Sequence, residues 1–157
     1  MDSRSVVASF FTCWRVQDVE WAIAHYHENA VYELHVDPSA ALVDRVYRGR
    51  EACRAALYAL LKDFDYLKYE PVINSVSGAT VRARVAFRYR HRTTGEILEG
   101  SRRLVFQVRE GLIVRVDGYY DTKLFSAFVR LMKDRERSMQ LRRPPQPPRR
   151  QREGSGA

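Results

Sequence analysis

Apolar residues recur at helical spacing near the start of the chain. Within residues 5–15 the apolar positions lie three and four apart, which is typical of an amphipathic helix. Asp18 is a favourable N-cap for a second helix, and Glu20 suits the first turn of that helix. The first helix is predicted to bury Val6, Val7, Phe10, Phe11 and Trp14, and the second Val19, Ala22, Ile23 and Tyr26.

A short strand and a longer helix are predicted next. Residues 30–36 favour a strand, which ends at Asp37-Pro38 because proline cannot donate a ladder hydrogen bond. Gly49 precedes a helix predicted over residues 50–64, where apolar residues again recur at helical spacing. The apolar face of this helix is expected to comprise Cys53, Leu57, Leu60, Leu61 and Phe64.

The apolar period changes from about 3.6 to 2 after this helix, which indicates strands. Short glycine-containing turns separate the strands, so neighbouring strands must pair antiparallel. The predicted strands span residues 67–76, 80–91, 97–109 and 112–120. A last helix begins near Asp121 or Thr122 and is expected to bury Leu124, Phe125, Phe128, Leu131 and Met132. This order predicts an α+β fold with the helices on one side of an antiparallel sheet.

Composition indicates one folded domain with a basic tail. The chain has 157 residues, 45% hydrophobic and 29% charged, and the domain is expected over residues 1–137. Residues 138–157 are rich in Pro and Arg and are predicted to be a disordered tail. This tail either contacts nucleic acid or a partner protein, or only solubilises the domain. No apolar run suffices to cross a bilayer and no signal peptide is evident, so a cytoplasmic protein is expected.

Three stretches carry a family resemblance. Val105-Phe106-Gln107-Val108-Arg109-Glu110-Gly111-Leu112-Ile113 is followed by Tyr119-Tyr120-Asp121, which matches a hairpin closed by an aromatic pair and an acid. Residues 29–32 and 47–52 match a first strand and the entry to a third helix. In order and spacing, residues 5–132 resemble the nuclear-transport-factor-2-like superfamily. The most similar branch contains ketosteroid isomerase, SnoaL-type polyketide cyclases and limonene epoxide hydrolase.

The resemblance implies a cone-shaped fold, whose strongly bent antiparallel sheet carries helices packed on its concave side around a pocket. It also implies a homodimer, and chemistry on apolar small molecules without a metal or an organic cofactor. In the hydrolase pattern, Tyr32 matches the tyrosine of the first strand and Arg84 matches the arginine. Leu34, Ala86 and Gly118 stand where the isomerase and hydrolase patterns have polar residues, so the usual carboxylates are absent in register.

Strand alternation does not decide which residues of the first strand face the interior. By default Tyr32 and Leu34 face inward, and Glu33, His35 and Asp37 form an outward, solvated or dimer-facing row. The alternative is that this polar row binds a metal or performs acid–base chemistry.

Arg84 and Asp117 also admit two interpretations. Alternation turns Val85 and Phe87 inward and Arg84 outward, whereas the resemblance turns Arg84 toward a substrate oxygen. Asp117 is either a surface acid or, if a bulge shifts the register, a replacement for the missing pocket acid. The predicted catalytic residues are Tyr32, Arg84 and Asp117. The predicted substrate-binding residues are Phe10, Trp14, Tyr26, Leu34, Tyr58, Phe106 and Tyr120.

Two functions follow from these features. The first is a cofactor-free enzyme of the SnoaL-like type that acts on an apolar substrate as an isomerase, dehydratase, cyclase or hydrolase. The fold, Tyr32 and Arg84 favour it. The second is a non-catalytic ligand-binding or dimerisation module of the same fold, which the missing carboxylates favour. The sequence contains no glycine-rich phosphate loop, nucleophile elbow or CxxC motif.

Overall fold

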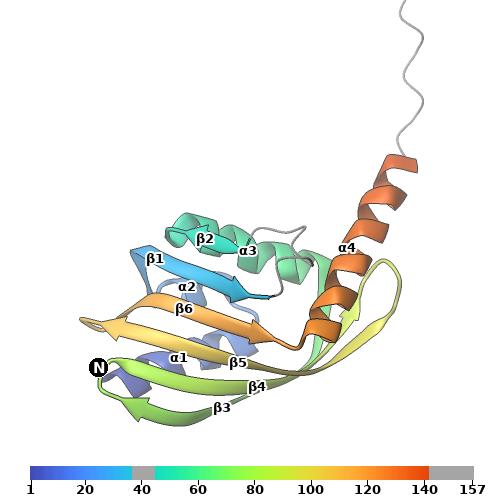
Figure 1. Ribbon diagram of the computed structural model, residues 1–157. Coiled ribbons are helices and arrows are strands. Elements are labelled where there is room, and N and C mark those ends of the chain that lie inside the picture. Colours follow the sequence, from blue (N-terminus) through green and yellow to red (C-terminus); the bar gives the residue numbers. More distant parts are fainter. Residues whose placement is uncertain (37–44, 142–157) are drawn as a thin grey trace, which may run out of the picture.

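The computed structural model describes residues 1–36 and 45–141. Helices α1 (Ser3–Arg15) and α2 (Val19–Ile23) are followed by strands β1 (Tyr26–His35) and β2 (Val46–Arg48). Helix α3 (Arg50–Asp63) leads into four longer strands (Figure 1): β3 (Phe64–Ser77), β4 (Thr80–His91), β5 (Ile97–Arg109) and β6 (Leu112–Tyr120). Helix α4 (Thr122–Leu141) comes last.

Helix α4 continues past residue 137, where the domain was expected to end. The predicted disordered tail, residues 138–157, lies outside the described residues from position 142 onward. Within residues 1–36 and 45–141, no helix is both long enough and apolar enough to cross a membrane.

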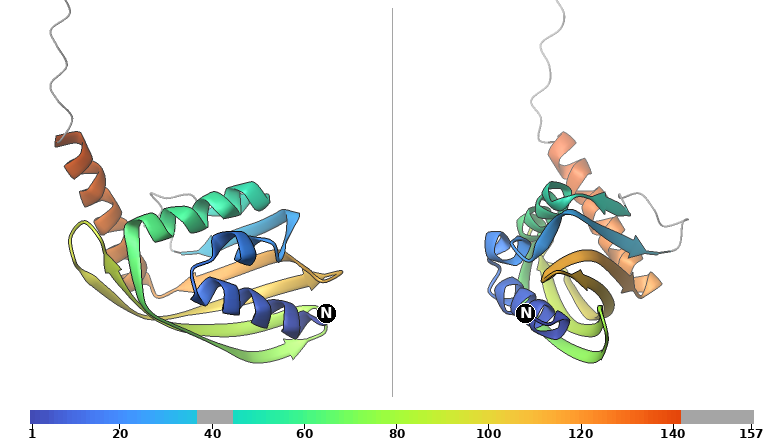
Figure 2. Two further views of the ribbon diagram at one scale, coloured as in Figure 1. Left: turned by 180° about the vertical axis from the view of Figure 1, so that it is seen from behind. Right: turned by 90° about the vertical axis from the view of Figure 1, so that its left-hand side faces the viewer.

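The six strands form one curled, unclosed sheet in the order β2-β1-β6-β5-β4-β3 (Figure 2). Strands β3 to β6 pair antiparallel, as their short turns predict. Strand β1 returns to lie parallel to β6, so that Leu34 is opposite Gly118. The predicted α+β fold with a bent sheet is therefore confirmed, with one parallel pair added to the antiparallel ladder.

Strand β2 is missing from the sequence-based prediction. It pairs antiparallel with β1, with Val31 opposite Arg48 and Tyr32 opposite Tyr47. Three residues are too few to display a period of two, so no alternation pattern marks this strand. Its effect is to bring the Tyr47 ring to 6.0 Å from the Tyr32 ring, centroid to centroid.

Side-chain caps fix the starts of the first two helices. Asp2 accepts a hydrogen bond from the Ser5 amide at 2.8 Å, and Asp18 accepts one from the Trp21 amide at 3.0 Å. Helix α1 lies against the concave face of the sheet (Figure 2), and its aromatic stripe is buried. There the rings of Phe10 and Phe106 lie 5.8 Å apart, which ties the helix to the middle of β5.

Strand β4 shows that the sheet has one apolar face and one charged face. Val81, Val85 and Phe87 are buried in the core. The alternate residues Arg82, Arg84, Arg88 and Arg90 are exposed on the opposite face. Alternation alone therefore decides the facing of this strand.

Helix α3 is less buried than its pattern predicts. Only Cys53 and Asp63 are buried, whereas Leu57, Leu60 and Leu61 are half-buried. Phe64, expected at the end of this helix, instead opens β3. The face of α3 that turns toward the sheet therefore borders unfilled space.

Candidate functional site

A cavity of about 470 Å³ lies between the concave face of the sheet and helices α1, α3 and α4. Its volume falls within the range of about 300–1,000 Å³ that is typical of small-molecule sites. Most of the lining is aromatic or aliphatic, so the cavity suits an apolar ligand. The aromatic lining residues are Phe10, Trp14, Tyr26, Tyr32, Tyr47, Tyr69, Phe106, Tyr120, Phe125 and Phe128.

Helix α3 keeps the cavity open through its small side chains. Ala52, Ala55, Ala56 and Ala59 all line the cavity from this one helix. A methyl group reaches only a short distance from the helix, so space remains between α3 and the sheet. This explains why the apolar residues of α3 stay half-buried: the helix covers a cavity rather than a filled core.

The polar centre of the cavity is a cluster of one arginine and two tyrosines. The Arg102 guanidinium on β5 donates through Nη1 to the Tyr120 hydroxyl at 2.6 Å and through Nη2 to the Tyr32 hydroxyl. Its central carbon also lies 4.3 Å from the centroid of the Tyr120 ring, within cation–π range. Three neighbouring strands, β1, β6 and β5, thus bring their side chains to one point.

Gly118 creates the space for this cluster. A Cβ at position 118 would lie 2.7 Å from Arg102 Nη2 and 2.8 Å from the Tyr32 hydroxyl oxygen. Both separations are shorter than any ordinary contact, so a larger residue would separate Arg102 from Tyr32. Gly118 lies between Leu34 and Leu104 in the sheet, directly beneath the cluster.

Electrostatics keep Arg102 cationic and Tyr120 protonated. Burial by itself lowers the pKa of Arg102, but the surrounding tyrosine oxygens outweigh this effect and raise it above its ordinary value. Burial raises the pKa of Tyr120 to about 12, even though the Arg102 charge acts in the opposite direction. At neutral pH Arg102 therefore carries a positive charge and Tyr120 keeps its hydroxyl proton.

Asp63 is the one carboxylate that lines the cavity among the described residues. It ends α3 and is 4% exposed, and its backbone carbonyl accepts a hydrogen bond from the Arg92 amide at 2.9 Å. Asp63 is not among the predicted site residues, because an acid in the last turn of a helix is usually solvated. Burial, which no local pattern reveals, makes it a candidate proton acceptor.

The structure places most of the predicted binding residues at the cavity but moves two candidates away. Phe10, Trp14, Tyr26, Tyr32, Leu34, Phe106 and Tyr120 all line it. Tyr58 does not: its side chain is 48% exposed, and its hydroxyl donates to Glu20 at 2.8 Å. Arg84 lies exposed on the opposite face of β4, for the alternation reason given above. The prediction that Tyr58 and Arg84 lie in the pocket is therefore wrong.

Arg102 is the pocket arginine instead of Arg84, and the sequence contains a signal for it. The residues of β5 that share its face are Leu98, Gly100, Leu104, Phe106 and Val108, so Arg102 is the one charged position on an apolar face.

Asp117 also lies outside the cavity, within an ion-pair cluster on the outer face of β1 and β6. It accepts a hydrogen bond from His35 Nε2 at 2.7 Å and from Arg115 Nη2 at 2.8 Å, and Arg115 also donates to Glu33. No bulge shifts β6 at this point, so Asp117 alternates outward between Val116 and Gly118. The idea that Asp117 replaces the pocket acid is corrected.

Glu33, His35 and Asp117 lie close enough to one another to suggest a metal site. One potential ligand atom from each lies within 4.8 Å of the others. Arg115 already donates to both carboxylates, and with His35 it lowers the pKa of Asp117 although burial alone would raise that pKa. The positive charge of Arg115 therefore already pairs with both carboxylates, and the cluster is an ion-pair network.

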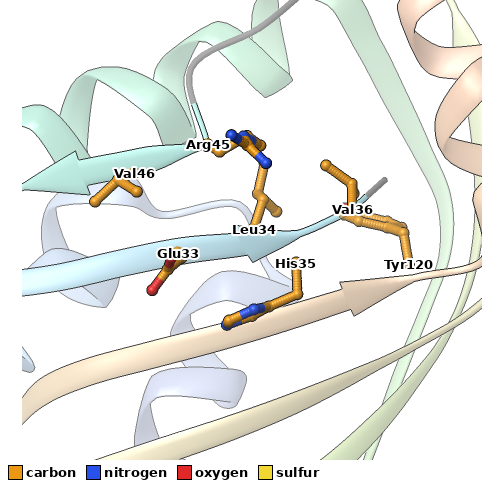
Figure 3. Close-up of a pocket in the computed structure, with 7 residues that line it drawn as sticks. All are labelled: Glu33, Leu34, His35, Val36, Arg45, Val46 and Tyr120. Atoms are coloured by element: carbon orange, nitrogen blue, oxygen red, sulfur yellow. The ribbon is translucent and has the colours of Figure 1, made fainter. Parts of the chain in front are cut away.

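A second, more open hollow of about 390 Å³ lies beside this network at the ends of β1 and β2 (Figure 3). Leu34 and His35 leave β1 in opposite directions there. Tyr120 lines both this hollow and the main cavity. The other lining residues are Glu33, Val36, Arg45 and Val46.

Comparison with known families identifies the chain. The model of the SnoaL-like domain matches residues 7–116, which is more than half of the sequence. The chain belongs to the SnoaL-like family. Among curated proteins, a search found none that matches this SnoaL-like protein.

Solved structures agree with this assignment. A candidate SnoaL-like polyketide cyclase from Mesorhizobium loti superposes with a TM-score of 0.65 at 18% identity, over 76% of this chain and 100% of its own. A candidate isomerase from Bacillus subtilis gives a TM-score of 0.68 at 21% identity, over 78% of this chain and 88% of its own. A nuclear-transport-factor-2-like protein of unknown function from Burkholderia pseudomallei gives a TM-score of 0.70 at 13% identity, over 83% of this chain and 97% of its own. At these identities the similarity establishes the fold.

Proposed function

We propose that this SnoaL-like protein is a small-molecule enzyme that acts without a cofactor on an apolar substrate, as an isomerase, dehydratase, cyclase or hydrolase. The observation that supports it best is the Arg102–Tyr32–Tyr120 cluster at an otherwise apolar cavity. From the family resemblance we also propose a cytoplasmic homodimer, which sedimentation of the purified protein would test.

The hydrogen-bond directions in the cluster favour stabilisation of a negative oxygen. Each phenol oxygen accepts a hydrogen bond from Arg102, so the hydrogen of each hydroxyl group is available to a substrate oxygen. Two such donors, backed by a guanidinium in a water-poor site, resemble an oxyanion hole. A carbonyl or epoxide oxygen that gains charge during reaction would bind there. Asp63 is the candidate base on the α3 side of the cavity.

Turnover of a substrate panel tests this proposal. Ketosteroids, terpene epoxides and aromatic polyketides should include at least one substrate that the wild-type protein converts. Tyr32→Phe and Arg102→Met should each lower kcat/KM by about 100-fold, the usual effect of removing one oxyanion donor. Arg84→Met changes an exposed arginine on the other face of the sheet and should leave kcat/KM unchanged. Equal losses in all three variants would contradict the proposed site.

A non-catalytic ligand-binding module is the second candidate function. The observation that favours it is that Leu34 and Gly118, which stand where the family patterns have polar residues, are uncharged and lie opposite each other on β1 and β6. This function predicts that compounds from the same panel bind and raise the unfolding temperature while no product forms. Asp63→Asn separates the two functions further, since it should abolish turnover but preserve binding.

A further inference from the structure

We infer that the ligand of the cavity is an apolar organic anion whose oxyanion group binds to the Arg102–Tyr32–Tyr120 cluster. This inference rests on the proposed function only in taking the cavity as the ligand site. It goes further by assigning a charge to the ligand. The contacts of Arg102, the distribution of charge and the shape of the lining carry the argument.

Arg102 is a buried cation with no carboxylate partner. It is 9% exposed, and no described acid forms an ion pair with it. More exposed arginines are paired: Arg115 with Glu33 and Asp117, and Arg54 with Glu20 and Glu51. An unpaired charge in the interior is unfavourable, and a bound anion would offset that cost.

The Arg102 guanidinium also has N–H donors beyond those that bind the two tyrosines. Arginine has five N–H donors, and only Nη1 and Nη2 of Arg102 form hydrogen bonds, each to a tyrosine. Its Nε is buried and donates to no group in residues 1–36 and 45–141. Neutral phenols offset the charge only in part, through their oxygens and the cation–π contact. The cluster would therefore favour a stronger hydrogen-bond acceptor than a phenol.

The remaining lining determines the rest of the ligand. Beyond the cluster the cavity wall is aromatic and aliphatic, apart from Cys53 and Asp63. A ligand that places its anionic group between Tyr32 and Tyr120 would thus bury an apolar body against α1 and the alanines of α3. Carboxylates and sulfonates of fused aromatic rings have this chemistry.

A matched pair of fluorescent probes tests the inference by binding alone. Anilinonaphthalene sulfonate and phenylnaphthylamine share one ring skeleton, and only the first carries an anionic group. We expect the full-length wild-type protein to bind the sulfonate at least about tenfold more tightly than the neutral amine, a difference typical of charged hydrogen bonds.

Three variants locate the source of that preference. Arg102→Met should remove the tenfold preference and leave the affinity for the neutral probe unchanged, which also shows that the cavity is intact. Arg102→Lys should retain part of the preference, because it keeps the charge but not the paired donors. Arg84→Met should leave both affinities unchanged, since Arg84 is exposed on the far face of the sheet.

Each outcome decides a separate question. Equal wild-type affinities for the two probes, or a preference that survives Arg102→Met, would overturn the anion inference and leave the proposed enzyme to its turnover test. If Arg84→Met removed the preference as fully as Arg102→Met, the preference would come from the basic outer surface of the sheet. This result would also overturn the inference. If neither probe binds the wild-type protein, the cavity does not bind aromatic ligands, and the inference fails.

Discussion

At the scale of single residues, the site depends on one arginine and on the glycine that makes room for it. Tyr32 and the aromatic walls could be predicted from the sequence because they follow from apolar alternation. Asp63 could not, because an acid at the end of a helix is expected to be solvated and only burial overrides that expectation. The side of β5 on which Arg102 lies becomes clear only when the alternation is counted from the buried residues Leu104 and Phe106.

Gly118→Ala should disrupt this arrangement. The added methyl group would lie within 3 Å of both Arg102 Nη2 and the Tyr32 hydroxyl, so both side-chain ends would have to shift. We expect a loss of about 1–3 kcal/mol in the free energy of unfolding, as for other overpacked sites. Denaturant unfolding measures that loss, and weaker binding of anilinonaphthalene sulfonate should accompany it.

Gly100→Ala is the matched control for this substitution. Gly100 is also a strand glycine without a positive φ, and its added methyl group would lie 3.0 Å from a terminal carbon of Leu124. Because Leu124 is half-buried and can shift, Gly100→Ala should affect stability less and probe binding not at all. Equal effects of the two substitutions on binding would show that the space at Gly118 is not specific to the cluster.

At the scale of elements, periodicity predicts the long strands and helices but not how closely they pack. The four long strands, helix α1 and the start of α4 match their predicted positions closely. Helix α3 shows the limit, because its leucines have the spacing of a buried face yet border a cavity. A pattern of apolar residues cannot tell a filled core from an apolar pocket, since both require the same side chains.

Filling the space beneath α3 should therefore reduce binding without unfolding the helix. Ala56→Leu adds three carbons at the cavity wall, and leucine favours helices almost as well as alanine does. The affinity for phenylnaphthylamine should fall at least about tenfold, equal to 1.4 kcal/mol. Ala8→Leu, at an exposed position of α1, is the control and should leave affinity unchanged. Unaltered binding to the Ala56→Leu variant would place the ligand elsewhere.

At the scale of the whole molecule, the order of elements and the final hairpin were sufficient to predict the fold. Strand β2 and the parallel pairing of β1 with β6 could not be predicted from the sequence, because both depend on contacts between distant segments. In the curled sheet β1 lies beside β6 and β6 beside β5 (Figure 2), and Tyr32 of β1 accepts a hydrogen bond from Arg102 of β5. The cavity is therefore a property of the assembled sheet and of no single segment.

The same curled sheet buries a group of tyrosines, which should make the protein sensitive to alkali. Burial raises the pKa of Tyr26, Tyr66, Tyr69 and Tyr89 well above 10.0, and that of Tyr120 to about 12. Above about pH 10 the unfolded chain loses these protons while the folded chain keeps them, so the folded state binds more protons. Stability must then fall as pH rises from about 10 toward the raised values, and it is unaffected by these groups below pH 10.

For Tyr120 alone, a rise in pKa from 10.0 to about 12 corresponds to about 3 kcal/mol of stability lost at high pH. Tyrosinate absorbance against pH measures the effect: in guanidinium chloride all nine tyrosines should titrate near the ordinary value. In the folded protein, the buried group should ionise only at higher pH, together with loss of the native circular dichroism. Reversible ionisation of all tyrosines near pH 10 with the native signal intact would mean that the cavity wall is open to water.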